Sequence, residues 1–100
     1  METFDLAQAF VRSPRIVGRR IAGELVLVPL VTHGADLDAI YNLNAVGAFI
    51  WDRLDGSAPG SAIVASLTEA FEVDPARAEA DYLEFLGQLV GLGAVEPAAP

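Results

Sequence analysis

Residues 43–56, Leu-Asn-Ala-Val-Gly-Ala-Phe-Ile-Trp-Asp-Arg-Leu-Asp-Gly, predict a short amphipathic helix around which the rest of the chain is organised. Asn44 is a good N-cap, because its side-chain carbonyl can accept a backbone N–H from the first turn. Gly56 is expected to end the helix, since glycine adopts the left-handed conformation at low cost. One face of the helix carries apolar residues at helical spacing, namely Val46, Phe49, Ile50 and Leu54, with Trp51 beside them.

The chain before this helix is predicted to form strands. Residues 16–21 and 25–31 are rich in β-branched and aliphatic residues, and Gly23 lies in the turn between them. Residues 37–43 predict a third strand, with Tyr41 and Leu43 on its core face.

The chain after this helix is predicted to form two further helices. One begins at Pro59 or Ser61 and ends at Phe71, and the other begins at Pro75 with Asp74 as its cap. The apolar stripe of this third helix is wider than one packed face requires. Its members are Ala78, Tyr82, Leu83, Phe85, Leu86, Leu89, Val90 and Leu92.

These elements predict an α+β fold of the winged helix-turn-helix type, with an N-terminal three-stranded antiparallel sheet followed by three helices. Residues 1–13 are expected to be an irregular or partly ordered arm, because chain termini are often loose. Residues 14–96 form the predicted domain, and residues 97–100 a loose tail.

Composition narrows the class of protein. The 100 residues are 53% hydrophobic and include no cysteine, which indicates a globular chain without disulfides or thiolate sites. No signal peptide or membrane span is predicted, so the expected compartment is the cytoplasm. The net charge is −8, with +1 in residues 1–33 and −9 in residues 34–100. An acidic helical half repels nucleic acid and anionic membranes.

No set of side chains predicts catalysis, a metal or a cofactor. His33 is the single histidine and is expected to be a solvated loop residue. Asp36 and Asp38 are expected at the surface, as are Glu79, Asp81 and Glu84. Without a nucleophile, a proton shuttle and an oxyanion site together, the chain is predicted to be a non-enzyme.

Two binding functions fit a sheet followed by three helices. The first is DNA binding, but the second and third predicted helices are acidic, which disfavours contact with phosphates. The second is capture of an extended peptide by an unpaired strand edge, beside an apolar helical groove. From the pattern alone, the extra apolar residues of the third helix could equally cover the N-terminal arm or a second subunit, so a homodimer stays open.

A further observation is an ordered series of residues that extends over most of the chain. Its positions are Tyr41, Leu43, Asn44, Gly47, Ile50, Trp51, Leu54, Asp55, Gly56, Ile63, Leu67, Phe71, Val73, Asp74, Pro75, Asp81, Phe85, Leu86, Leu89 and Gly93. This series resembles the PqqD family of peptide chaperones. The likeness covers roughly residues 13–96, including an opening hairpin over residues 15–27.

This resemblance implies a recognition domain for ribosomally made, post-translationally modified peptides. Such proteins bind the leader segment of a precursor peptide and present it to a modifying enzyme, often a radical SAM protein or a leader peptidase and cyclase. They need no cofactor or metal. Pyrroloquinoline quinone, a lasso peptide or another modified peptide could be the product.

The resemblance places the leader as a strand beside the third strand and against the third helix. The strand positions are Asp38, Ala39, Ile40, Tyr41 and Asn42, and the helix positions are Glu79, Tyr82, Leu83, Leu86 and Val90. Apolar leader residues are expected to fill the side formed by Leu83, Leu86 and Val90. The acids near the third helix predict a preference for a leader that carries Lys or Arg.

Overall fold

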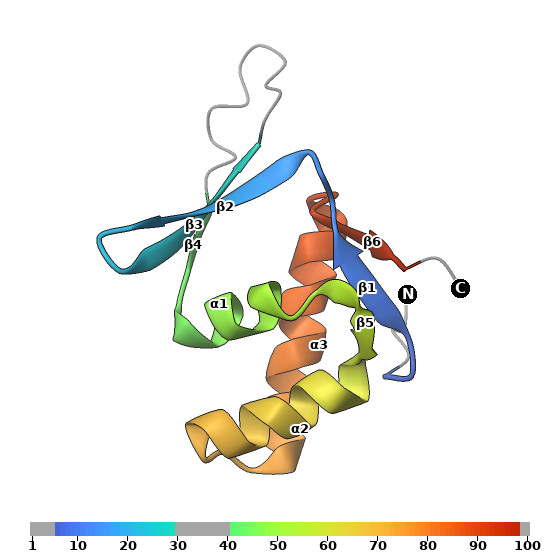
Figure 1. The fold of residues 1–100 in the computed structure, drawn as a ribbon. Helices are drawn as coiled ribbons and strands as arrows, with labels where there is room; N and C mark the ends of the chain where they lie inside the picture. Colours follow the sequence, from blue (N-terminus) through green and yellow to red (C-terminus); the bar gives the residue numbers. More distant parts are fainter. Residues whose placement is uncertain (1–5, 30–40, 99–100) are drawn as a thin grey trace.

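The computed structural model describes residues 6–29 and 41–98, which form two small sheets and three helices. Figure 1 shows the β2–β3 hairpin on one side of α1 and α3, with β1, β5 and β6 on the other. The predicted α+β class, with a three-stranded antiparallel sheet and three helices, is confirmed. The elements are β1 (Ala9–Arg12), β2 (Ile16–Ile21), β3 (Glu24–Pro29), β4 (Tyr41–Leu43), α1 (Ala45–Asp52), β5 (Asp55–Pro59), α2 (Gly60–Phe71), α3 (Pro75–Gly91) and β6 (Val95–Pro97).

The β2–β3 hairpin forms where the sequence predicts it. Its two-residue turn has positive φ at Ala22 (52°) and Gly23 (84°), the combination that suits the twist of a tight hairpin. The strands pair in register from Ile21 with Glu24 to Ile16 with Pro29. Side chains of β3 alternate between the core and the outer face, and Leu25 and Leu27 are buried.

The third strand of this sheet is β4, which pairs antiparallel with β3. Leu43 lies opposite Leu25 and packs at the margin of the core, as predicted. Of the predicted strand over residues 37–43, Tyr41–Leu43 is observed, and residues 37–40 lie outside the described part of the chain.

The helix that follows begins as predicted but ends earlier. The side chain of Asn44 caps α1 by accepting a hydrogen bond from the backbone N–H of Gly47 at 2.8 Å. The helix stops at Asp52, and Arg53 closes it in the right-handed region. The prediction that Gly56 ends this helix is wrong, because Gly56 has a φ of +84° within strand β5.

A second sheet, with strand order β5-β1-β6, is absent from the sequence prediction. Its central strand, β1, lies in the segment that was expected to be an irregular arm. Its edge strand β6 includes Pro97, which was assigned to a loose tail. Both expectations are therefore wrong for these residues. Pairing of β1 with β5 and β6 ties the start, the middle and the end of the described chain together.

The helices α2 and α3 pack closely and enclose the core with α1. A Cβ added at Gly60 would lie 2.8 Å from the ring of Tyr82, so glycine lets the start of α2 approach α3. Asp74 occupies the N-cap position of α3 as predicted, although its side chain makes no capping hydrogen bond. The side chains with at most 1% exposure include Ile50, Leu54, Ile63, Leu67, Tyr82, Leu86 and Leu89.

Candidate functional site

One edge of β4 is unpaired within the described residues. In the sheet order β2-β3-β4, strand β3 covers one side of β4, and no strand among residues 6–29 and 41–98 covers the other. Backbone groups on such an edge can accept a further strand.

The register identifies which residue faces outward. The pair beside a two-residue turn exchanges both backbone hydrogen bonds, and such pairs alternate along antiparallel strands. Ile21 and Glu24 are the pair beside the turn, so the backbone N–H and C=O groups of residues 24 and 26 point toward β2. Those of residues 25 and 27 point the other way, toward β4. The bonding groups of Asn42, opposite Val26, therefore point away from β3, toward the unpaired edge.

A hollow of about 350 Å³ lies next in sequence to β4, between the start of α1 and one side of α3. We call it the α3 hollow. Its apolar surface comes from Val46 and Phe85, which are partly buried against the core. The two helices approach closely here, since a Cβ on Gly47 would lie 3.4 Å from the ring of Phe85. Its remaining lining residues are Asn44, Arg77, Asp81, Glu84 and Gln88.

The α3 hollow carries an excess of negative charge. Arg77 pairs with Asp81 one helical turn away, at 3.3 Å. Glu84 is exposed and forms no ion pair with the described residues. A cation on a bound chain therefore has a carboxylate available at this site.

Two residues predicted for the peptide site belong to the core instead. Tyr82 is 1% exposed and Leu86 is fully buried, so neither can contact a peptide at the surface. Burial also raises the pKa of Tyr82. Placing these two side chains on the groove was wrong, because they are the innermost members of the wide apolar stripe.

The other predicted helix residues lie on the opposite flank of α3. Successive helical residues are about 100° apart, so Leu83 and Phe85 project about 160° apart. Leu83 and Val90 are partly buried at the core, and Glu79 is exposed. None of the three lines the α3 hollow. The candidate peptide-contacting surface of α3 is therefore on the side of Phe85, whereas the prediction had placed it on the side of Leu83.

On the strand, Asn42 is exposed and lies on the unpaired edge. Tyr41 belongs to β4, whereas the predicted positions Asp38, Ala39 and Ile40 lie outside the described residues.

Sequence reasoning missed the polar members of the α3 hollow. Arg77, Asp81, Glu84 and Gln88 follow one another at intervals of three or four residues, so they share one side of a helix. This pattern is typical of a solvated face, and Asp81 and Glu84 were assigned to one. The spacing of these residues does not show that Asn44, which directly follows β4, brings the start of α1 to the polar side of α3.

Other kinds of site find no support in the described residues. No group of three or more His, Asp or Glu side chains among residues 6–29 and 41–98 is placed to hold a metal ion. In the same residues, every helix is too short or too polar to cross a bilayer.

Comparison with known proteins identifies the family. The family model described as Coenzyme PQQ synthesis protein D (PqqD) matches residues 24–95. A solved structure, TbiB1 in complex with the TbiA(beta) leader peptide, is similar with a TM-score of 0.72 and 28% sequence identity. The match covers 90% of this chain and 99% of that one. No curated protein sequence matches the chain. The family match spans most of the described fold, including β3, β4 and all three helices, and this protein therefore belongs to the PqqD family.

Proposed function

We propose that this protein binds the leader segment of a ribosomally synthesised precursor peptide and presents the peptide to a modifying enzyme. The observation that carries the proposal is the unpaired edge of β4 together with the α3 hollow, whose lining begins at Asn44, the residue that follows β4. Membership of the PqqD family supports it, as does similarity to a protein whose structure was solved with a leader peptide.

The leader is proposed to add as a strand along the outer edge of β4. Its backbone would exchange hydrogen bonds with Asn42, each with a net contribution of about 0.5–1.5 kcal/mol. Apolar leader residues would contact Val46 and Phe85, and each well-buried anchor adds about 1.5–3 kcal/mol. Ordering a flexible leader opposes binding by about 2–5 kcal/mol or more, so the anchors decide which leader binds.

The charge of the site favours a leader that carries Lys or Arg near these anchors. Glu84 is the acidic group available to such a cation, since Asp81 already pairs with Arg77. Charge of this kind mainly accelerates association and improves selectivity, and its effect falls as salt rises.

Binding of DNA by the helices is disfavoured by the same charges. In α3, Arg77 is the single basic residue beside Glu79, Asp81 and Glu84. A helix that enters the major groove needs the opposite balance, because phosphates surround it.

A radical SAM protein or a leader peptidase and cyclase would act on the bound precursor. Enzymes of these two classes are the partners that the resemblance to the family implies. A homodimer formed through the edge of β4 would compete with the leader for that edge, so leader binding should favour the monomer.

The test is a titration with leader peptides by fluorescence anisotropy. The probes are the TbiA(beta) leader and the leader of any precursor peptide encoded beside this protein's gene. Val46→Asp should weaken binding at least about tenfold by placing a charge among the anchors. An acidic residue in the first turn suits a helix, so α1 should remain folded.

Leu92→Asp is the matched control, because Leu92 is 39% exposed at the end of α3 and does not line the α3 hollow. It should bind within about twofold of the wild type, since a surface change away from a binding site has little effect. Undiminished binding by folded Val46→Asp, checked by circular dichroism, would contradict the proposal.

A further inference from the structure

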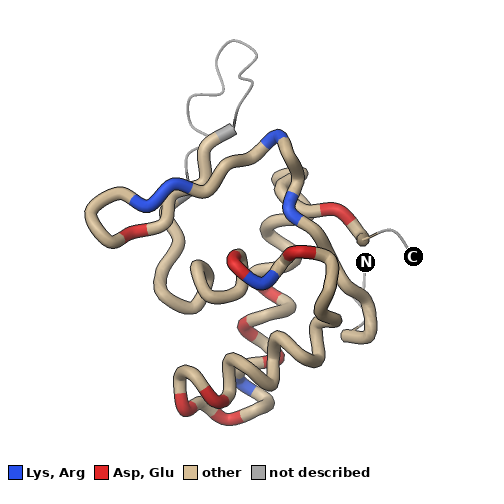
Figure 2. Tube along the Cα trace, in the orientation of Figure 1, with Lys and Arg blue, Asp and Glu red and all other residues tan. Residues whose placement is uncertain are grey.

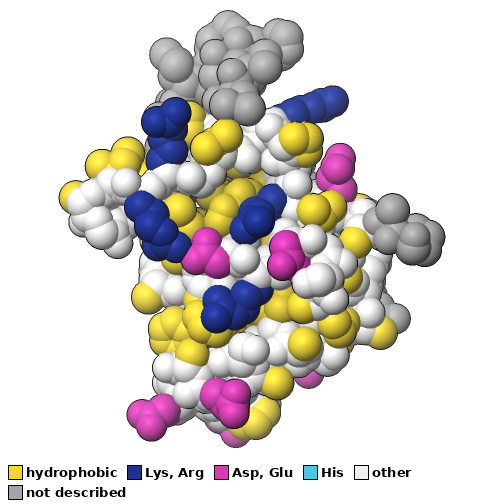
Figure 3. Space-filling model, viewed as in Figure 1, with side chains coloured by type: hydrophobic (Ala, Val, Ile, Leu, Met, Phe, Trp, Pro, Cys, Tyr) yellow, Lys and Arg dark blue, Asp and Glu magenta, His cyan; other side chains and the backbone are white. Residues whose placement is uncertain are grey.

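A second surface of the molecule is basic although the chain as a whole has a net charge of −8. Five of the six arginines lie on β1, β2, the turn between them and the end of α1, namely Arg12, Arg15, Arg19, Arg20 and Arg53. Figure 2 shows basic residues along these elements and acidic residues on α2 and α3. Figure 3 shows blue side chains gathered on this face, with yellow apolar side chains and some magenta carboxylates between them.

The centre of this surface is a hollow of about 480 Å³ between β2 and the end of α1. We call it the Trp51 hollow. Arg12, Arg20 and Asp52 provide its charged groups, and Ile16 and Val17 provide apolar surface beside the buried Trp51. It shares no lining residue with the α3 hollow.

The indole N–H of Trp51 lacks an acceptor among the described residues. Nε1 donates no hydrogen bond to the described residues, and the atom keeps contact with solvent although the residue as a whole is only 4% exposed. Gly18, which also lines the hollow, leaves space beside this atom, because a Cβ there would lie 2.8 Å from Nε1. Water can therefore solvate the N–H, and an acceptor from a bound chain can reach it and replace that water.

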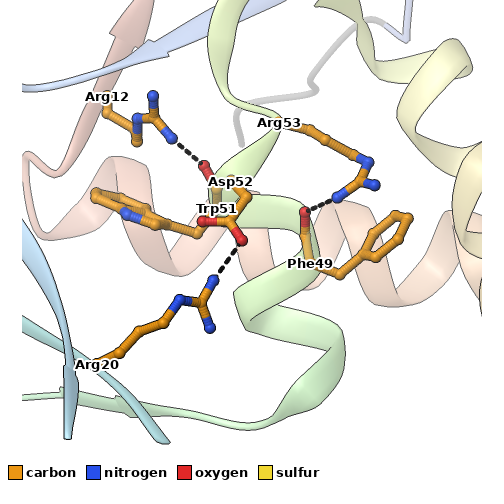
Figure 4. Close-up of polar contacts among 6 residues, drawn as sticks. All are labelled: Arg12, Arg20, Phe49, Trp51, Asp52 and Arg53. Carbon is orange, nitrogen blue, oxygen red and sulfur yellow. Dashed lines mark hydrogen bonds and ion pairs between the residues drawn. The ribbon is translucent and has the colours of Figure 1, made fainter. Parts of the chain in front are cut away.

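Two guanidinium groups flank the indole, as Figure 4 shows. Arg12 lies 6.0 Å from the ring centre and donates one hydrogen bond, at 3.0 Å, to the carbonyl of Trp51. Its other N–H groups remain available, since a guanidinium has five. Arg20 contacts Asp52 at 2.6 Å, and both side chains are about half exposed. An exposed pair of this kind contributes little, so Arg20 can turn to another carboxylate at small cost.

The nearby carboxylates do not fill this role. Asp52 is held by Arg20 at the margin of the hollow. Asp55 accepts hydrogen bonds from the backbone N–H and the hydroxyl of Ser57, at 2.9 and 2.6 Å. Hydrogen bonds from Ser57, with a smaller contribution from the charge of Arg12, lower the pKa of Asp55. Among the described residues, neither carboxylate accepts a hydrogen bond from Arg12 or from the indole.

We infer that the Trp51 hollow is a second binding site, which takes a Glu or Asp side chain from an acidic segment of a partner protein. One carboxylate can accept from Arg12, Arg20 and the indole N–H together. Apolar residues of the same segment would contact Ile16 and Val17, which line the hollow. A protein segment fits better than nucleic acid, because it can place a single carboxylate between Asp52 and Asp55 and set apolar side chains on Ile16 and Val17. A nucleic acid carries a charge at every phosphate, so it would meet both carboxylates.

This site goes beyond the proposed leader function and does not depend on it. A chaperone that holds a leader at the α3 hollow would still have the basic surface available for a second protein. The two proposals can therefore fail independently, and each has its own set of variants.

The test uses Trp51 as the reporter, since the chain has one tryptophan and gives a single indole cross-peak in a ¹H–¹⁵N spectrum. The full chain is titrated with the peptide acetyl-Leu-Glu-Glu-Leu-Glu-Glu-amide. The same peptide with Gln in place of every Glu, sodium sulfate and a short DNA duplex are the comparison probes.

We expect a saturable shift of the indole cross-peak with the acidic peptide and none with the Gln peptide. Arg20→Gln should weaken this binding about fivefold to tenfold, because it removes one charged donor. Arg19→Gln is the matched control, since neighbouring strand residues face opposite sides and Arg19 does not line the hollow. The control should change binding less than about twofold.

Any one of five results would overturn the inference. The first four are no indole shift with the acidic peptide, an equal shift with the Gln peptide, equal weakening by Arg19→Gln and Arg20→Gln, and tighter binding of DNA than of peptide. A shift with sulfate as strong as that with the peptide would indicate an adventitious ion only and would also overturn it. Leader binding should be unchanged in both variants.

Discussion

Glu79 and Glu84 are two glutamates on the same helix whose surroundings differ. Both are exposed on α3, but only Glu84 lines the α3 hollow. Converting either one to lysine changes the net charge of the protein equally. A difference in leader binding between the two variants therefore results from where the charge lies on the helix and not from the total charge.

We predict that Glu84→Lys weakens binding of a basic leader about threefold to tenfold and reduces its salt dependence, because it replaces an attraction by a repulsion. Glu79→Lys should stay within about twofold of the wild type, since exposed charges at a distance are screened. Anisotropy titrations at low and high salt measure both effects. Equal weakening by the two variants would remove the α3 hollow from the account.

Gly60 and Gly91 give a corresponding comparison for stability. Alanine at residue 60 would bring a Cβ to within 2.8 Å of the buried ring of Tyr82, whereas nothing lies within 4 Å of a Cβ at residue 91. We predict that Gly60→Ala lowers the free energy of unfolding by about 1–3 kcal/mol, the cost of overpacking. Gly91→Ala should be neutral or stabilising by up to about 1 kcal/mol, because alanine favours a helix. Urea unfolding followed by circular dichroism measures both, and equal effects would contradict the close contact of α2 with α3.

Among the elements, β4 carries the proposed function through one outward-facing residue. We predict that Asn42→Pro removes the outward backbone N–H and weakens leader binding at least about fivefold, while the bonds between β3 and β4 remain. Asn42→Ala keeps the N–H and is the control, with binding expected within about twofold of the wild type. Titration of each variant with the leader measures the two affinities, and thermal unfolding checks that each variant is folded. Wild-type affinity in a folded Asn42→Pro variant would exclude strand addition at this residue.

The elements that the sequence predicted best are those whose signals are local. Gly23 suits the positive φ that the β2–β3 turn requires of it, and Asn44 and Asp74 suit the N-cap positions of α1 and α3. Ala22 also has a positive φ, for which its type gives no signal. Strand β5 reads Asp-Gly-Ser-Ala-Pro, a composition typical of a turn. It is a strand because β1 pairs with it, and no short window of sequence records that pairing.

The candidate site was predicted less completely than the fold for a related reason. The α3 stripe is apolar on both flanks of Leu86, so spacing alone did not decide which flank faces a groove. The fold decides it by bringing Val46 and Gly47 beside Phe85. The resemblance placed Tyr82 at the peptide site, yet Gly60 gives its ring a place in the core.

Over the whole molecule, charge is divided between two surfaces. The α3 hollow is acidic, and the surface around the Trp51 hollow is basic. This division fits a protein that binds a basic leader at one place and an acidic partner at another. Raising the salt concentration should weaken both associations, because the charges involved are near the surface.

The central claim is that an extended leader occupies the edge of β4 and the α3 hollow together. A ¹⁵N-labelled sample titrated with the TbiA(beta) leader peptide tests it directly by amide chemical shifts. The account predicts the largest shifts at Asn42, Leu43, Val46, Glu84 and Phe85, and small shifts at Glu79 and Leu83. Large shifts confined to the Leu83 flank or to the Trp51 hollow, or no shift at all, would contradict it.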